Sequence, residues 1–204
     1  MQFIEFRKLL GNFVCFSKID IEKLFPAFNK MNLVNWQKKG YIIKIKNGWY
    51  SFTDFELYEN KLYSIANKIY DPSYISMETA LFYYGFIPEA VFKISSVSTL
   101  KTNAIKTKIG DFVYHSIKEK LFFGYSIVKE EKAFYKIAYP EKAILDFLYF
   151  KKDIKTIDDF SGLRLNKKRL SDTINLKKFD NSVLLFESKA LTKRAKLLKE
   201  YLYA

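Results

Sequence analysis

The first forty residues carry apolar positions at the spacing of short amphipathic helices. Ser17, followed three residues later by Asp20, has the form of a capping box that opens a second helix, and Pro26 ends that helix. Gly40 stands at the position expected just after a third helix over residues 29–39. The first helix is predicted from residues that lie roughly on one helical face: Phe3, Phe6, Leu10 and Phe13.

A β-hairpin is predicted directly after these helices. Residues 41–46 and 49–52 have the composition of strands, and Asn47-Gly48 between them predicts a tight type I′ turn. Three short helices followed by a hairpin are the element order of a winged helix-turn-helix. We therefore predict a domain of this kind over residues 1–53.

The remaining residues mix helical and strand patterns. We predict a connecting helix within residues 54–72, which Asp71-Pro72 ends, and a larger α+β domain over residues 73–204, with an antiparallel sheet and C-terminal helices. Ser76 is expected to cap the first helix of that domain and Gly85 to follow it. Strands are predicted at residues 94–99, 111–117 and 134–138, and helices at 77–84, 140–150, 166–175 and 188–203.

The net charge favours a polyanionic partner. The chain carries 35 Lys and Arg against 22 Asp and Glu, which gives +13 at pH 7. Only four of the basic residues are Arg, so we expect many point-charge contacts to phosphate and few bidentate contacts to guanine. The high aromatic content, 18%, argues against an intrinsically disordered chain.

One segment of the N-terminal domain contains no acidic residue. Between Glu22 and Asp54 there is no acid, and this window spans the third predicted helix and the hairpin. With Leu33 and Trp36 in the core, Asn32 and Asn35 fall on or beside the opposite face, where they could pair with adenine. The residues predicted to contact DNA are Lys30, Asn32, Asn35, Lys38, Lys39, Lys44, Lys46 and Asn47.

Two further features of the sequence leave alternatives open. The last 54 residues hold the largest excess of basic side chains, which form either a solvated helical face or a second contact to DNA or to an acidic partner protein. Trp36 and Trp49 could stack on a ligand, but core packing is the favoured interpretation.

Several classes of protein are excluded or disfavoured. A single cysteine, Cys15, allows no internal disulfide, and together with the single histidine, His115, it cannot form a structural zinc site. The longest nearly apolar run, residues 80–88, is far too short for a membrane helix, and the charged N-terminus does not resemble a signal peptide. We expect a soluble cytoplasmic protein without a cofactor, and no enzyme motif is present.

The spacing of two acidic residues and one lysine leaves a catalytic function open as an alternative. Asp111, followed by Glu130 and Lys132, is similar to the arrangement of metal-dependent nucleases of the restriction-endonuclease fold. Such chemistry needs two carboxylates on a divalent cation and a lysine near the attacked phosphate. In a chain rich in Lys and Glu this spacing also arises by chance, so the nuclease is the remote alternative.

Three segments and the hairpin resemble one known family. They are Ser73-Tyr-Ile-Ser-Met-Glu-Thr-Ala-Leu-Phe-Tyr-Tyr-Gly85-Phe-Ile-Pro88, the strand ending Val97-Ser-Thr99, Ile137-Ala-Tyr-Pro-Glu-Lys-Ala-Ile-Leu-Asp146 and the hairpin segment Lys46-Asn-Gly-Trp-Tyr50. Together they are similar to the AbiE-type antitoxins of bacterial type IV toxin–antitoxin systems, over roughly residues 1–150. One departure is a recognition helix that is rich in Asn and Lys and has no Arg.

The resemblance implies a protein of two functional parts. Its N-terminal domain would bind inverted repeats in the promoter of its own operon and repress it. Its C-terminal domain would counteract a nucleotidyltransferase-like toxin in phage defence by abortive infection, with or without a stable complex. The family motif residues are Ser76, Gly85, Pro140, Glu141, Lys142 and Asp146, and we interpret the Pro-Glu start of this helix as structural. The alternative is a winged-helix regulator whose second domain binds an effector or a protein.

Overall fold

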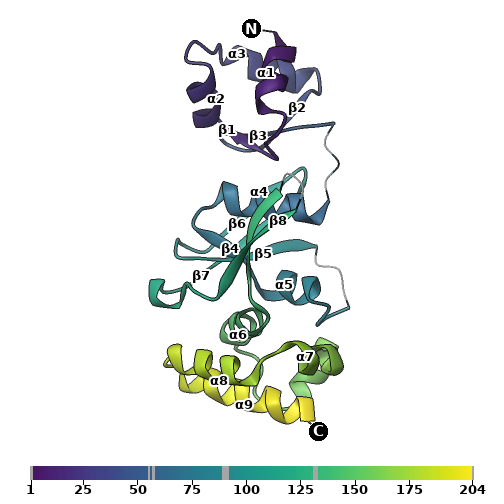
Figure 1. Cartoon of the computed structure of the whole chain (residues 1–204), viewed down its shortest axis with the longest axis vertical. Coiled ribbons are helices and arrows are strands. Elements are labelled where there is room, and N and C mark those ends of the chain that lie inside the picture. Colours follow the sequence, from purple (N-terminus) through teal and green to yellow (C-terminus); the bar gives the residue numbers. More distant parts are fainter. Residues whose placement is uncertain (1, 55, 57, 89–91, 131–132, 204) are drawn as a thin grey trace.

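Three parts follow one another along the long axis of the molecule (Figure 1). The computed structural model describes residues 2–54, 56, 58–88, 92–130 and 133–203. An N-terminal domain comes first, a layer of strands with a covering helix lies in the middle, and a group of helices forms the C-terminal end (Figure 1). Among the described residues we find no helix with the length and apolar character that a membrane span requires.

The N-terminal domain has the architecture of a winged helix-turn-helix. Its elements are α1 (Phe3–Leu10), β1 (Phe16–Ser17), α2 (Lys18–Leu24), α3 (Met31–Lys38), β2 (Ile42–Lys46) and β3 (Trp49–Phe52). The three strands form an antiparallel sheet in the order β1-β3-β2. Helices α2 and α3 with the turn between them are the helix-turn-helix, and β2 with β3 is the wing.

An aromatic core holds the helices of this domain against one face of its sheet. Phe6 contacts the rings of Phe16 and Trp36, with ring centres 5.4 and 4.6 Å apart. Trp36 is therefore a core residue, as predicted. Phe6 and Leu10 are fully buried, but the prediction for Phe13 is wrong because α1 ends at Leu10 and the Phe13 side chain is exposed.

The predicted capping box of α2 is confirmed. The backbone N–H of Ser17 donates to Oδ2 of Asp20 (2.7 Å), and the backbone N–H of Asp20 donates to Oγ of Ser17 (3.1 Å). These two bonds satisfy N–H groups that have no partner inside the helix. Helix α3 begins two residues later than predicted, and Gly40 follows it with φ +71°, a backbone conformation that glycine adopts without strain.

The turn of the wing differs from the predicted type I′. A type I′ turn needs positive φ at both central residues, but of Asn47 and Gly48 only Gly48 has it, at +83°. The strand pairing shifts by one residue before the turn, since Lys44 lies opposite Tyr50 and Lys46 lies opposite Trp49. The extra residue, Ile45, makes this a β-bulge.

The second domain is built on a six-stranded sheet, which confirms the predicted α+β class. The strands are β4 (Ser73–Ile75), β5 (Lys93–Ser98), β6 (Asn103–Thr107), β7 (Gly110–Ser116), β8 (Tyr125–Glu130) and β9 (Ala133–Ala138), in the spatial order β6-β7-β5-β4-β9-β8. The sheet is mixed rather than wholly antiparallel, because β5 pairs with β7 and β4 with β9 in parallel. Strands β4, β6 and β8 are additions to the predicted set.

The helices of this domain largely follow the predicted pattern. They are α4 (Glu59–Ile69), α5 (Met77–Tyr83), α6 (Pro140–Phe150), α7 (Lys167–Thr173), α8 (Leu176–Leu185) and α9 (Lys189–Tyr203), with 3-10 turns at Glu119–Leu121 and Asp158–Leu163. Pro140 begins α6, as predicted. Helix α8 is an addition to the predicted set. Asn175 does not end the preceding helix, as predicted, because its side chain accepts a hydrogen bond from the backbone N–H of Lys178 and caps α8.

Helix α4 belongs to the core of the second domain. Its residues Tyr63, Ile65, Ala66 and Ile69 are buried in the same cluster as the sheet and α6. Of the segment predicted as helix before Glu59, Phe55 and Leu57 lie outside the described residues. Val14, Cys15 and Ile45 of the N-terminal domain join this cluster too, so the two domains share an apolar contact.

Candidate nucleic-acid interface

One face of α3 is exposed and carries mixed apolar, amide and cationic side chains. Leu33 and Trp36 are buried. Met31 and Val34 keep 58% and 43% of their area exposed, and Asn35 is exposed beside them. The burial pattern agrees with the predicted core and the opposite, solvent-facing side. Met31 and Val34 were not predicted as contacts; apolar side chains of this kind can contact the methyl group of thymine.

The two candidate base-reading asparagines differ in accessibility. Asn35 is exposed in the middle of the helix, whereas Asn32 in its first turn is half-buried. Before the helix, the side chain of Asn29 accepts a hydrogen bond from the backbone N–H of Met31 (2.9 Å), and Lys30 lies 3.4 Å from the carboxylate of Glu22 on α2. Asn35 is therefore the better placed of the two for contact with a base edge.

Three of the predicted phosphate-binding lysines lie free at the surface. Lys38 ends α3, Lys39 follows it, and Lys44 lies on the wing strand β2; all three are exposed. None of them forms an ion pair with an acidic side chain in the part of the chain that the structure describes. Their charges are thus available for a polyanion, and Asn47 is exposed at the tip of the wing beside them along the chain.

Lys46 does not belong to this face. Its ammonium donates a hydrogen bond to the backbone carbonyl of Ile69 at the end of α4, and it lies 6.0 Å from the ring centre of Tyr70. Partial burial lowers the pKa of this lysine. Simple alternation along β2 puts Lys44 and Lys46 on one side, but the bulge at Ile45 turns Lys46 toward the second domain. The prediction of Lys46 as a DNA contact is therefore wrong, because its ammonium is bound to the second domain.

Three residues of the family motif, Ser76, Lys142 and Asp146, lie elsewhere, in the interior of the second domain. Lys142 and Asp146 form an ion pair across one turn of α6, with side chains 3% and 0% exposed. Asp146 also accepts hydrogen bonds from Tyr74 (2.9 Å) and Ser76 (2.8 Å), and Lys142 donates to the Tyr74 hydroxyl (2.7 Å). Ser76 stands at the N-cap position of α5, but its side chain makes no capping bond, because its hydroxyl is directed to Asp146.

Aromatic rings surround the ammonium of Lys142. It lies 5.2, 5.2 and 5.1 Å from the ring centres of Tyr74, Phe123 and Phe186, respectively. Burial lowers the pKa of Lys142, while the carboxylate of Asp146 acts in the opposite direction. Gly124, with φ +73°, lies so close that an added Cβ would come within 3.1 Å of the Lys142 side chain. These contacts leave only 2% of Lys142 exposed, which supports the structural interpretation of Lys142 and Asp146.

The other motif residues hold helices together. The carboxylate of Glu141 accepts a hydrogen bond from the backbone N–H of Asn175 (2.8 Å), which links α6 to the start of α8. Gly85 follows α5 with φ +71°, and Arg169 from α7 donates to the carbonyl of the preceding residue, Tyr84 (3.1 Å). Tyr74 is the member of this network that sequence reasoning missed, because nothing in the short strand β4 marks its hydroxyl as a partner.

The nuclease arrangement does not form. Asp111 lies on β7 and Glu130 on β8, and three strands separate β7 from β8 in the sheet. At about 4.8 Å between neighbouring strands, the two backbones are about 19 Å apart. Glu130 instead accepts a hydrogen bond from Asn60 (3.2 Å), and Lys132 lies outside the described residues. Within the described residues, no group of three or more His, Cys, Asp and Glu side chains is arranged to hold a metal ion.

The single cysteine and the single histidine of the chain both lie in apolar surroundings. Burial raises the pKa of the Cys15 thiol to about 12, as expected for a buried hydrophobic residue rather than a nucleophile. His115 on β7 contacts the ring of Phe150, with centres 5.1 Å apart, and burial lowers its pKa. Both agree with the structural roles predicted for them.

Some basic side chains of the C-terminal helices interact with other residues of the same helices. Lys199 pairs with Asp180 at 2.8 Å, joining α9 to α8, and Lys167 lies 4.2 Å from the ring centre of Tyr201. Arg194 is buried, with only 8% of its area exposed. Part of the positive charge is thus paired within these helices. This favours a solvated helical face over a second contact to DNA or to an acidic partner protein.

Comparison with known proteins adds no relative. No model of a known protein family matches the chain, and no curated protein matches it either. The resemblance to AbiE-type antitoxins therefore stays a prediction that rests on the sequence motifs quoted above.

Proposed function

We propose that this protein is a DNA-binding repressor that acts through its winged helix-turn-helix. The single observation that carries the proposal is the exposed face of α3 and the adjacent wing, where Asn35, Lys38, Lys39 and Lys44 meet no acidic partner among the described residues. A helix of this kind fits the major groove, and lysines at its end and on the wing are suited to phosphates on either side.

We further propose that the repressor is the antitoxin of a type IV toxin–antitoxin operon. The support for this step is the resemblance of residues 1–150 to AbiE-type antitoxins. In this proposal the first domain represses the shared promoter in the cytoplasm, and the second domain counteracts a nucleotidyltransferase-like toxin. We propose no enzymatic activity for it: Ser76, Lys142 and Asp146 of the motif are buried and bonded to one another, as structural residues are.

The two functions are tested with the full chain and one double variant. The unaltered chain is expected to bind a duplex that carries its own upstream region and to restore growth when it is co-expressed with the neighbouring toxin gene. The Lys38→Ala/Lys39→Ala variant should lose promoter binding and repression while growth rescue persists, since α3 lies far from the second domain's core (Figure 1).

The outcomes separate the proposals. Unchanged promoter affinity in the double variant would reject the winged-helix interface. Promoter binding without growth rescue would reject the antitoxin role and leave the alternative, a regulator whose second domain binds an effector or a protein.

A further inference from the structure

A hollow of about 490 Å³ lies where the wing meets the second domain. Trp49 of β3 contributes one wall, and Ile127 and Phe134 of the β8–β9 hairpin contribute another. Lys68 and Asp71, near the end of α4, and Lys136 of β9 supply its charged groups. Its volume falls within the range of sites that enclose small organic ligands.

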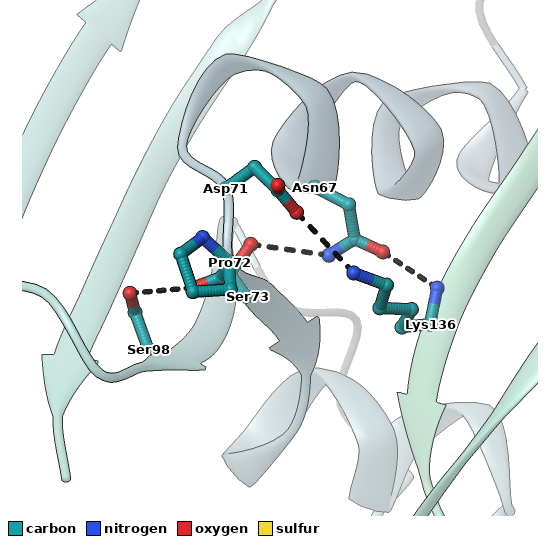
Figure 2. Close-up of polar contacts among 6 residues, drawn as sticks. All are labelled: Asn67, Asp71, Pro72, Ser73, Ser98 and Lys136. Atoms are coloured by element: carbon teal, nitrogen blue, oxygen red, sulfur yellow. Dashed lines mark hydrogen bonds and ion pairs between the residues drawn. The ribbon is translucent and has the colours of Figure 1, made fainter. Parts of the chain in front are cut away.

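The polar side of the hollow is held in place by hydrogen bonds (Figure 2). The side-chain oxygen of Asn67 accepts from the backbone N–H of Lys136 (2.6 Å), and the Lys136 ammonium lies 3.2 Å from the carboxylate of Asp71. Next to Asp71 along the chain, the carbonyl of Pro72 accepts a hydrogen bond from the hydroxyl of Ser98 (2.6 Å). A ligand would therefore meet a preformed polar wall rather than have to order one.

The apolar side of the hollow is unusually exposed. Ile127 and Phe134 keep 70% and 50% of their area open to solvent. They come from neighbouring strands, where Ile127 lies opposite Lys136 and Phe134 opposite Lys129. Together with the partly buried indole of Trp49, they offer apolar and aromatic surface on which a flat ring can lie.

The charge at the hollow is positive. Lys136 is balanced by Asp71, but Lys68 forms no ion pair within the described part of the chain. The Lys68 ammonium lies 5.5 Å from the ring centre of Phe13, and the exposed Lys129 places a second ammonium 5.4 Å from the ring centre of Phe134. An occupant with a ring for Trp49 and Phe134 and one negative charge for Lys68 satisfies both halves of the site.

We propose that this hollow is a binding site for a small planar aromatic anion, such as an aromatic carboxylate or sulfonate. The ligand would touch the wing through Trp49 and the second domain through Phe134 and Lys68. Because it contacts both domains, its binding is placed to be coupled to the position of the wing, which the proposed DNA-binding function uses. Ligand binding is measured without DNA, so the result tests the ligand site independently of the proposed DNA-binding function.

The experiment uses the full chain and the fluorescent aromatic anion 1-anilinonaphthalene-8-sulfonate. We expect saturable binding that indole-3-acetate displaces at least about fourfold more effectively than the neutral, equally shaped indole-3-acetamide, the range of one exposed ionic contact. This comparison is made on the unaltered chain, so it tests the proposal whatever any variant does. Equal competition by the two indoles, or no saturable binding, would overturn it.

Variants at exposed positions locate the site. Phe134→Ser and Ile127→Ser should each weaken the binding of the probe about tenfold, because each removes apolar contact area from the ligand. Lys68→Met should reduce the preference for acetate over acetamide, with Lys129 beside Phe134 left in place. Phe92→Ser is the matched control, since Phe92 is 97% exposed and lies outside the hollow, and it should change nothing. Unchanged probe affinity in both hairpin variants would overturn the assignment of the site.

Discussion

The ammonium of Lys46 on the wing donates a hydrogen bond to the backbone carbonyl of Ile69, the last residue of α4. Carbonyls in the last turn of a helix have no partner within the helix, and a cation placed there also interacts favourably with the helix dipole. This bond joins the two domains across the same contact that Ile45 and Cys15 make through apolar packing. The wing therefore has one side for the second domain and one side for solvent.

Lys44 and Lys46 are two residues apart, yet we expect them to respond differently to substitution. Lys46→Met removes a hydrogen bond from a charged donor, so it should lower the free energy of unfolding by about 1.5 kcal/mol. This corresponds to a melting temperature about 3–6 °C lower, with the salt dependence of DNA binding unchanged. Lys44→Met should leave the melting temperature in place and reduce the log–log salt slope by about 0.9. The same response from both variants would contradict the bulge geometry.

The proposed phosphate contacts at the end of α3 predict a specific salt dependence. With the three free lysines, Lys38, Lys39 and Lys44, on phosphates, the log–log slope of affinity against salt should be about −2.7. Lys38→Ala/Lys39→Ala should make it shallower by about 1.8, as measured by fluorescence anisotropy at several salt concentrations. Lys118→Ala/Lys152→Ala removes the same charge from exposed positions of the second domain and is the control. A slope that changes equally in both variants would indicate a general charge effect.

Asn35 is expected to read a base. Because it is exposed on the face opposite Leu33 and Trp36, Asn35→Ala should reduce the preference for adenine at one operator position by about 1–3 kcal/mol. Affinity for unrelated duplex DNA should not change. Asn32→Ala is the matched control, since Asn32 is half-buried, and it should have the smaller effect on base discrimination. Binding to a panel of single-base operator variants measures both.

The buried pair Lys142–Asp146 predicts strong coupling between two substitutions. Lys142→Met and Asp146→Asn should each cost about 3–5 kcal/mol of unfolding free energy, because each leaves an uncompensated buried charge. The double variant should cost less than the sum, since it is neutral and the amide oxygen introduced by Asp146→Asn can still accept a hydrogen bond from the Tyr74 or Ser76 hydroxyl. Urea unfolding measures all three, and additive losses would contradict the buried pair.

An exposed pair with the same spacing is the control for this cycle. Lys196 and Glu200 on α9 lie 3.8 Å apart across one helical turn, with side chains 77% and 43% exposed. The corresponding substitutions there, Lys196→Met and Glu200→Gln, should each change stability by less than about 0.5 kcal/mol, because water screens such a pair. The contrast between the two cycles isolates the effect of burial.

His115 predicts the pH dependence of stability. Burial lowers its pKa below the ordinary value of 6.5; the nearby carboxylates of Glu78 and Asp146 act in the opposite direction, and Lys151 lowers it further. Below pH 6.5 the unfolded chain therefore binds more protons than the folded one, so stability is lost as the pH falls through that value. The loss is at most about 1.4 kcal/mol per pH unit for one proton.

This dependence should disappear in one variant. His115 is the single histidine of the chain, so His115→Gln should flatten the free energy of unfolding between about pH 6.5 and pH 5.5, while the carboxylates still act at lower pH. Urea unfolding at half-unit intervals of pH measures the slope. A slope near pH 6 that persists in the variant would show that another group causes it.

Much of the local structure could be predicted because it depends on residues close together in the chain. The Ser17–Asp20 capping box, the start of α6 at Pro140 and the hairpin around Gly48 each involve a few consecutive residues. Strand β4 was missed for a different reason. It has three residues, all buried, so neither alternation nor length distinguishes it from a loop.

By itself, the sequence determined the α+β class, the three helices and hairpin of the first domain and the exposed, acid-free face of α3, since helical periodicity and turn chemistry act over a few residues. It did not predict β1, the third strand of that domain's sheet. Only the tertiary structure decided that Lys46 faces the second domain, because a one-residue bulge reverses the alternation. It also brought Tyr74 and Ser76 onto Asp146, about 70 residues further along the chain. Such contacts depend on how the sheet and α6 pack together, and no local pattern encodes that packing.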